Sequence, residues 1–130
     1  MLLPERDIRY LADRGLTYEI SVDQGMTCLV VKEWPLPAGL SPGQVDLLLR
    51  LAPGYPDIPP DMWWFSPQVT CHSGLPIQGT QVTEGYLGRT WQRWSRHLPA
   101  GVWRSGVDGL ESFFAVIRAD VTACVAGAPV

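Results

Sequence analysis

The nine-residue segment PGYPDIPPD, residues 53–61, constrains the fold of this chain more than any other feature, because four of its residues are prolines. Proline has no amide hydrogen to give to a β-ladder or a helix interior, and it forces extended backbone on the residue before it. No regular helix or strand is therefore expected here. The prolines predict a rigid, extended ledge, and Tyr55 and the tryptophans after it are expected to pin that ledge to the core.

The chain before this segment predicts one helix and three strands. In order, they are a helix over residues 5–13 that ends at Gly15, a β-hairpin over 16–34 that turns at Asp23-Gln24-Gly25, and, after a Pro/Gly-rich loop over 35–43, a buried strand over 44–52. The apolar run QVDLLLRLA indicates that the third strand is the most buried of the three.

The chain after the segment predicts a short aromatic strand over 62–69, a polar, Gly-rich surface loop over 70–90 and a C-terminal helix over 106–125. Asp108 or Ser105 is the expected N-cap of that helix. This order of elements predicts an α+β fold, an antiparallel meander of about four strands flanked by N- and C-terminal helices. The length of 130 residues predicts one domain over residues 1–130.

Composition excludes several classes of function. The net charge of −3 disfavours nucleic-acid binding, and no apolar run reaches the roughly 18 to 20 residues of a membrane span. The start of the chain lacks the apolar region of a secretory signal, so a cytoplasmic protein is expected. Cys28, Cys71 and Cys124 are widely spaced, which argues against a disulfide framework or a structural zinc site and leaves no expected metal or cofactor.

Two motifs resemble the ubiquitin-conjugating enzyme (UBC) superfamily. Residues 47–65 contain a full match, from Tyr55 to Pro60, to the Y-P-x-x-P-P motif that follows the third strand in that family. Trp103 resembles the tryptophan of a W-x-P motif before the family's next helix, with Ser105 in place of the proline. The aromatic and arginine-rich block 88–104 looks closest to prokaryotic UBC-like proteins that are encoded beside activating enzymes and ubiquitin-like proteins, in operons linked to defence against phage.

The resemblance suggests two positions for a nucleophile. Ser95 stands eight residues before Trp103, which is the spacing at which the family carries its nucleophile. Cys71 is the obvious thiol, but it falls where the family has a His-Pro-Asn segment. His72 then takes the place of the family histidine and Gly74 that of the oxyanion-stabilising asparagine. Ser95 is the first hypothesis and Cys71 the alternative.

The block around Ser95 supplies candidate supporting residues. A serine hydroxyl needs a base within hydrogen-bond reach, and His97 is two residues away. Arg93 and Arg96 are candidates to hold an oxyanion or the carboxyl tail of a modifier, although arginines over tryptophan faces are as often simply solvated. Trp94 is expected to anchor this block, and His72 is a further candidate for binding.

The resemblance implies an acyl carrier. Such a protein takes a ubiquitin-like protein from an activating enzyme, holds it as an oxyester on Ser95 or a thioester on Cys71, and passes it to an amine of a target protein. The missing asparagine favours a different hypothesis, a non-catalytic UBC-like binding module. A serine hydrolase is disfavoured because no G-x-S-x-G elbow surrounds Ser95.

Overall fold

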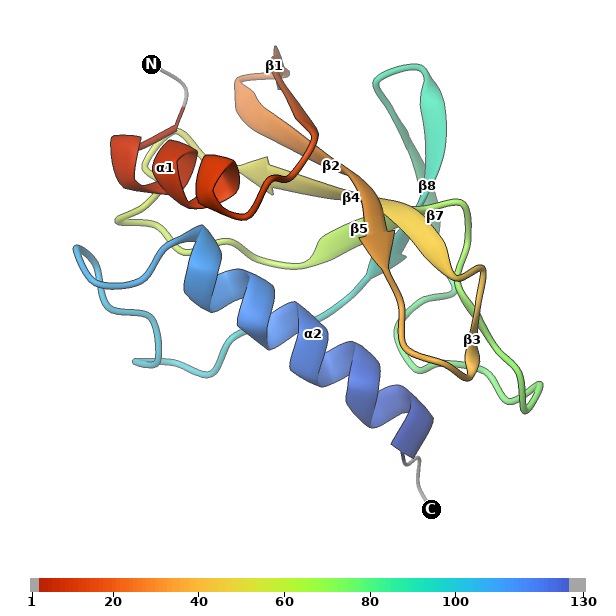
Figure 1. The fold of residues 1–130 in the computed structure, drawn as a ribbon. Coiled ribbons are helices and arrows are strands. Elements are labelled where there is room, and N and C mark those ends of the chain that lie inside the picture. Colours follow the sequence, from red (N-terminus) through yellow and green to blue (C-terminus); the bar gives the residue numbers. More distant parts are fainter. Residues whose placement is uncertain (1–2, 127–130) are drawn as a thin grey trace.

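The computed structural model describes residues 3–126 and has the predicted α+β architecture (Figure 1). Its elements are α1 (Glu5–Asp13), β1 (Tyr18–Asp23), β2 (Met26–Pro35), β3 (Leu40–Ser41), β4 (Gln44–Leu51), β5 (Trp63–Ser66), β6 (Thr70–Cys71), β7 (Thr83–Tyr86), β8 (Arg89–Trp94) and α2 (Leu110–Ala126). The first helix, the first hairpin and the buried third strand lie where the sequence predicts them.

The main sheet has six strands in the order β1-β2-β4-β5-β8-β7, and each neighbouring pair is antiparallel. The predicted meander of four strands is present as β1, β2, β4 and β5. The prediction of a loop over residues 70–90 is wrong for β6, which pairs with β3, and for β7 and the start of β8, which form a hairpin. Leu87 and Gly88 turn this hairpin with positive φ angles of 56° and 77°, a conformation that joins two strands closely.

The sheet separates two apolar clusters because side chains alternate between its faces. The larger cluster contains Leu47 and Leu49 of β4 and Trp63 of β5, and α2 covers it with Phe113 and Phe114. The smaller cluster lies on the other face and consists of Cys28, Val30, Leu48, Trp64 and Trp91, with Met62 and Tyr86 packed against them. Figure 1 shows α1 and α2 on the same side of the sheet.

The proline-rich segment is anchored as predicted, but it is turned rather than extended. The Ile58 amide donates to the Gly54 carbonyl at 2.9 Å, which closes a turn around Tyr55 and Pro56. The Trp103 indole Nε1 donates to the Pro56 carbonyl at 2.8 Å. The segment therefore lies against Trp103, and the prediction that its backbone is extended is wrong for the turn around Tyr55 and Pro56.

The last helix begins at Leu110, four residues later than predicted, and its expected caps face other groups. Asp108 accepts a hydrogen bond from the Arg104 amide at 2.7 Å, and the Ser105 hydroxyl donates to Asp57. The Leu110 amide donates instead to the Asp7 carboxylate at 3.0 Å. A residue of α1 thus caps α2 from the other end of the chain, which local sequence patterns do not reveal.

Candidate functional site

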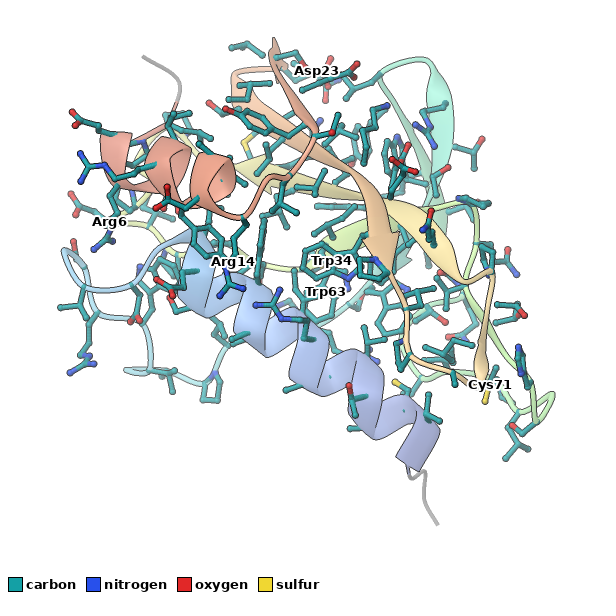
Figure 2. All side chains as sticks on the ribbon, viewed as in Figure 1. Arg6, Arg14, Asp23, Trp34, Trp63 and Cys71 are labelled. Carbon is teal, nitrogen blue, oxygen red and sulfur yellow. The ribbon has the colours of Figure 1, made fainter. Side chains whose placement is uncertain are left out.

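Cys71 is positioned by a short two-stranded ribbon at the edge of the molecule. In this ribbon Leu40 pairs with Cys71, and the His72 amide donates to the Gly39 carbonyl at 2.8 Å. The His72 Nε2 and the Ser41 Oγ share a hydrogen bond of 2.8 Å. Figure 2 shows Cys71 beside β3, near the end of the molecule where α2 terminates. His72 therefore helps to hold the ribbon that carries the partly exposed thiol of Cys71.

A groove of about 930 Å³ brings both candidate nucleophiles together. Its lining includes Cys71, Ser95 and Arg96, although Cys71 and Ser95 are 24 positions apart in sequence. Residues 73 and 75–79 form part of its wall, and Asp120, Ala123, Cys124 and Val125 of α2 form another part. Neither His97 nor Arg93 is among the residues that line it.

The surroundings of Cys71 lower the pKa of its thiol. The Ser73 hydroxyl donates to the Cys71 sulfur at 3.1 Å, and this hydrogen bond lowers the pKa of Cys71 below that of an ordinary thiol. Burial raises the pKa of Cys28 and of Cys124. Since the thiolate is the nucleophile, Cys71 is the thiol best prepared to react.

Ser95 lines the groove without a base at its hydroxyl. Its backbone amide donates to the Gly79 carbonyl at 2.9 Å, and its Oγ lies 3.8 Å from the Met62 sulfur. His97, the base expected from the sequence, directs its Nδ1 to the Asp61 carboxylate at 2.7 Å. Both side chains of that pair are more than half exposed. In the part of the chain that the structure describes, no hydrogen bond links His97 to Ser95.

Arg96 joins three segments at the groove. Its Nε donates to the Asp120 carboxylate at 2.9 Å, its Nη1 donates to the Gln78 carbonyl at 2.7 Å, and its guanidinium lies 5.0 Å from the centre of the Trp94 ring. Trp94 itself is fully buried in the larger cluster. The expectation that Trp94 anchors the block is consistent with this burial, and the buried ring is not available as a binding surface in this structure.

Arg93 belongs to the other side of the sheet. It forms an ion pair of 3.3 Å with Glu84 of β7, and the same carboxylate accepts a hydrogen bond from the Trp64 indole at 2.8 Å. Trp64 and Trp91 are members of the smaller cluster. The structure therefore separates Arg93 from Arg96, which the sequence placed in one functional block.

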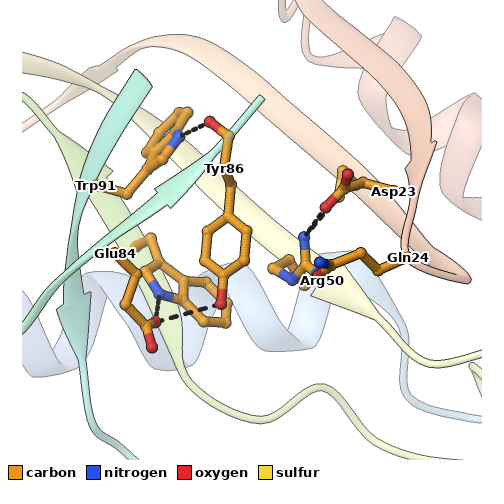
Figure 3. A network of polar contacts seen from close by, with 8 residues as sticks. Asp23, Gln24, Arg50, Glu84, Tyr86 and Trp91 are labelled. Atoms are coloured by element: carbon orange, nitrogen blue, oxygen red, sulfur yellow. Dashed lines mark hydrogen bonds and ion pairs between the residues drawn. The ribbon is translucent and has the colours of Figure 1, made fainter. Parts of the chain in front are cut away.

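A second polar network lies over that smaller cluster (Figure 3). Arg50 forms an ion pair of 2.9 Å with Asp23, and its guanidinium lies 4.0 Å from the centre of the Tyr86 ring. A polar hollow of about 400 Å³ lies beside these groups, between the turn at Gln24 and the hairpin around Leu87. Arg50 of β4 thus links the turn between β1 and β2 to the hairpin of β7 and β8.

Sequence reasoning missed Ser73 and Asp120. A serine two residues after a cysteine can bond to the sulfur when a local turn joins the two, so the sequence carried a weak signal for Ser73. Asp120 had none, because its contact with Arg96 depends on how α2 packs. Within residues 3–126, no group of three or more His, Cys, Asp or Glu residues is placed to bind a metal ion, and no helix has the length and apolar character of a membrane span.

In a comparison with protein families, residues 3–123 match Prokaryotic E2 family E. The match covers nearly the whole chain of 130 residues, and the groove-lining residues outside it are Cys124 and Val125. Comparisons with curated proteins and with solved structures gave no match.

Proposed function

The chain belongs to Prokaryotic E2 family E, and on this premise we propose that it is a conjugating-type acyl carrier whose reactive site is the groove containing Cys71. The family supports a ubiquitin-conjugating-like role. The finer proposal is that the protein receives the C-terminal carboxyl of a ubiquitin-like protein from an activating enzyme and transfers it to an amine of a target protein.

The observation that carries this proposal is the environment of Cys71. Its sulfur is partly exposed, lines the groove and accepts a hydrogen bond from Ser73. A thiolate accepts an acyl group readily and gives it up to an amine, which are the two properties that a carrier needs. The geometry therefore favours a thioester on Cys71.

An oxyester on Ser95 is the second candidate because Ser95 lines the same groove and stands at the family spacing before Trp103. It lacks a base in this structure, since His97 is turned to Asp61. A serine hydroxyl is almost fully protonated at neutral pH and reacts slowly without such a base. A change in the direction of the His97 side chain would be needed before it could serve Ser95.

The test is to incubate the protein with its activating enzyme, ATP and ubiquitin-like protein and to follow the covalent adduct by gel and mass spectrometry. A Cys71 thioester forms in wild type and in Ser95→Ala, is lost in Cys71→Ala, and is cleaved by excess thiol through exchange. Cys28→Ala removes a buried thiol on the other face of the sheet and serves as the matched control.

The alternative outcomes are distinct. An adduct that survives thiol, is cleaved by mild alkali and is lost in Ser95→Ala assigns the carrier role to Ser95. In that case His97→Ala and Asp61→Ala are both expected to slow its formation, because they remove the base and its partner. If a working activating enzyme gives no adduct with wild type, the chain is a non-catalytic binding module.

A further inference from the structure

We propose that Ser73 is a catalytic residue of the groove, whose hydroxyl bonds in turn to the Cys71 thiolate and to the oxyanion that forms during acyl transfer. This inference rests on the proposed function, because it assigns a role to Ser73 in the chemistry of Cys71. It assigns no new partner.

The geometry of the turn after Cys71 directs the Ser73 proton to the sulfur. The Leu75 amide donates to the Ser73 Oγ at 3.2 Å, and the Ser73 Oγ lies 3.1 Å from the Cys71 sulfur. A hydroxyl oxygen that accepts one hydrogen bond is polarised and becomes a better donor in the next. The Gly74 amide closes the turn by donating to the Cys71 carbonyl at 3.0 Å.

Acyl transfer also needs a donor at the carbonyl oxygen of the thioester, because negative charge develops there. Arg96, the cation of the groove, already donates to Asp120 and to the Gln78 carbonyl. The Ser73 hydroxyl is different, because its present acceptor is the reacting sulfur itself. Once that sulfur is acylated it is a poor acceptor, and the hydroxyl is released to the neighbouring carbonyl oxygen.

In the transfer step the Ser73 hydroxyl donates to two acceptors in succession, first the carbonyl oxygen and then the Cys71 sulfur. The amine nitrogen attacks the thioester carbon, and the carbonyl electron pair moves to oxygen, where the Ser73 hydroxyl donates to the oxyanion. When the carbonyl re-forms, the carbon–sulfur bond breaks and its electron pair leaves with the Cys71 sulfur as thiolate. The amine proton goes to solvent, and the Ser73 hydroxyl returns to the sulfur.

The first test measures the rate of iodoacetamide alkylation of Cys71 against pH in the full chain, with the site assigned by mass spectrometry. In Ser73→Ala the midpoint moves to higher pH, and the rate at pH 7 falls about two- to tenfold because one hydrogen bond to the thiolate is lost. Ser73→Thr restores the wild-type profile. Ser41→Ala, which removes a hydroxyl of the same ribbon that contacts His72 and not sulfur, keeps it.

The second test measures discharge. Cys71 is charged by exchange with a short peptide thioester, without an activating enzyme, and the loss of the acyl group to added hydroxylamine is timed. Ser73→Ala slows discharge about 10- to 100-fold, as expected for removal of an oxyanion donor, and Ser73→Thr does not. This readout responds to the carbonyl oxygen and not to the packing of the ribbon.

Three results overturn the proposal. If Ser73→Ala is alkylated with the same pH profile as wild type, Ser73 does not stabilise the thiolate. If its discharge is also as fast as in wild type, Ser73 does not donate to the oxyanion. A discharge defect found in Gln78→Ala instead assigns that role to the amide side chain of Gln78. Both tests use the chain without its enzymatic partners, so their failure is distinguishable from a failure of enzymatic charging.

Discussion

The carboxylate of Asp7 in α1 accepts a hydrogen bond from the backbone amide of Leu110, the first residue of α2, at 3.0 Å. Its other oxygen accepts the Tyr55 hydroxyl at 2.6 Å. Asp7 is only 2% exposed, although its side chain is polar and lies in a helix near the start of the chain. One buried carboxylate therefore ties the first helix, the proline-rich segment and the last helix together.

Replacing Asp7 by Ala is expected to lower the free energy of unfolding by about 2–4 kcal/mol, because it leaves a helix N-terminal amide and a buried phenol without their acceptor. Asp7→Asn retains an acceptor oxygen and is expected to lose less. Urea denaturation measures both. Glu5→Ala is the control, since Glu5 pairs with Arg9 on the exposed side of α1 and should change stability by less than about 0.5 kcal/mol. An Asp7→Ala protein as stable as Glu5→Ala would contradict the capping role.

Tyr55 is expected to make the fold sensitive to alkali. Burial raises the pKa of the Tyr55 phenol well above that of a free tyrosine, and the Asp7 carboxylate raises it further. Because the pKa is higher in the folded state, the protonated phenol stabilises the fold. This stabilisation is complete at a pH below the unfolded-state pKa of about 10 and is lost progressively as the pH rises from there toward the folded-state pKa. Wild type should therefore lose stability faster than Tyr55→Phe as the pH rises above about 10 in urea denaturation. Parallel curves for the two proteins would refute this.

Gly79 is expected to be required at the groove for two reasons. Its φ angle of +78° is unfavourable for other residues, and an added Cβ would lie 2.8 Å from the Arg96 Nη1. Gly74 has a similar φ of +81°, but a Cβ there would meet nothing within 4 Å. Gly74→Ala should cost about 1 kcal/mol from the backbone alone, and Gly79→Ala should cost about 1 kcal/mol more. Equal losses in thermal denaturation would show that the close approach to Arg96 does not matter.

Arg96 is expected to hold the wall of the groove. Arg96→Ala removes the ion pair with Asp120 and the bond to the Gln78 carbonyl, so we expect a loss of about 1–3 kcal/mol and faster hydrogen exchange at the amides of residues 77–82. Arg104→Ala is the matched control. If hydrogen exchange is unchanged in Arg96→Ala, residues 77–82 keep their structure without Arg96. Strand β7 lies within the range 70–90 that the sequence predicts as a surface loop, and those of its amides that bond to β8 should exchange slowly in every variant.

The elements that depend on neighbouring residues could be predicted from the sequence. Gly15 ends α1 with a φ of +65°, and Gln24 and Gly25 turn the first hairpin with positive φ angles, because these conformations depend on residues close in the chain. The hairpin of β7 and β8 was missed because its β7 strand, TEGY, has no alternation of apolar side chains. The β8 strand of this hairpin also pairs with β5, and the sequence pattern does not show that contact.

The sequence by itself determined the α+β class, the position of the proline-rich segment and the motifs that suggested the family. Only the tertiary structure decided which reactive residues meet. It placed Cys71 and Ser95 in one groove, turned His97 toward Asp61 and put Arg93 across the sheet from Trp94. The physical reason is that helix and turn formation depends on a few adjacent residues, whereas a groove depends on the packing of α2 against the sheet, which brings together residues with no fixed spacing.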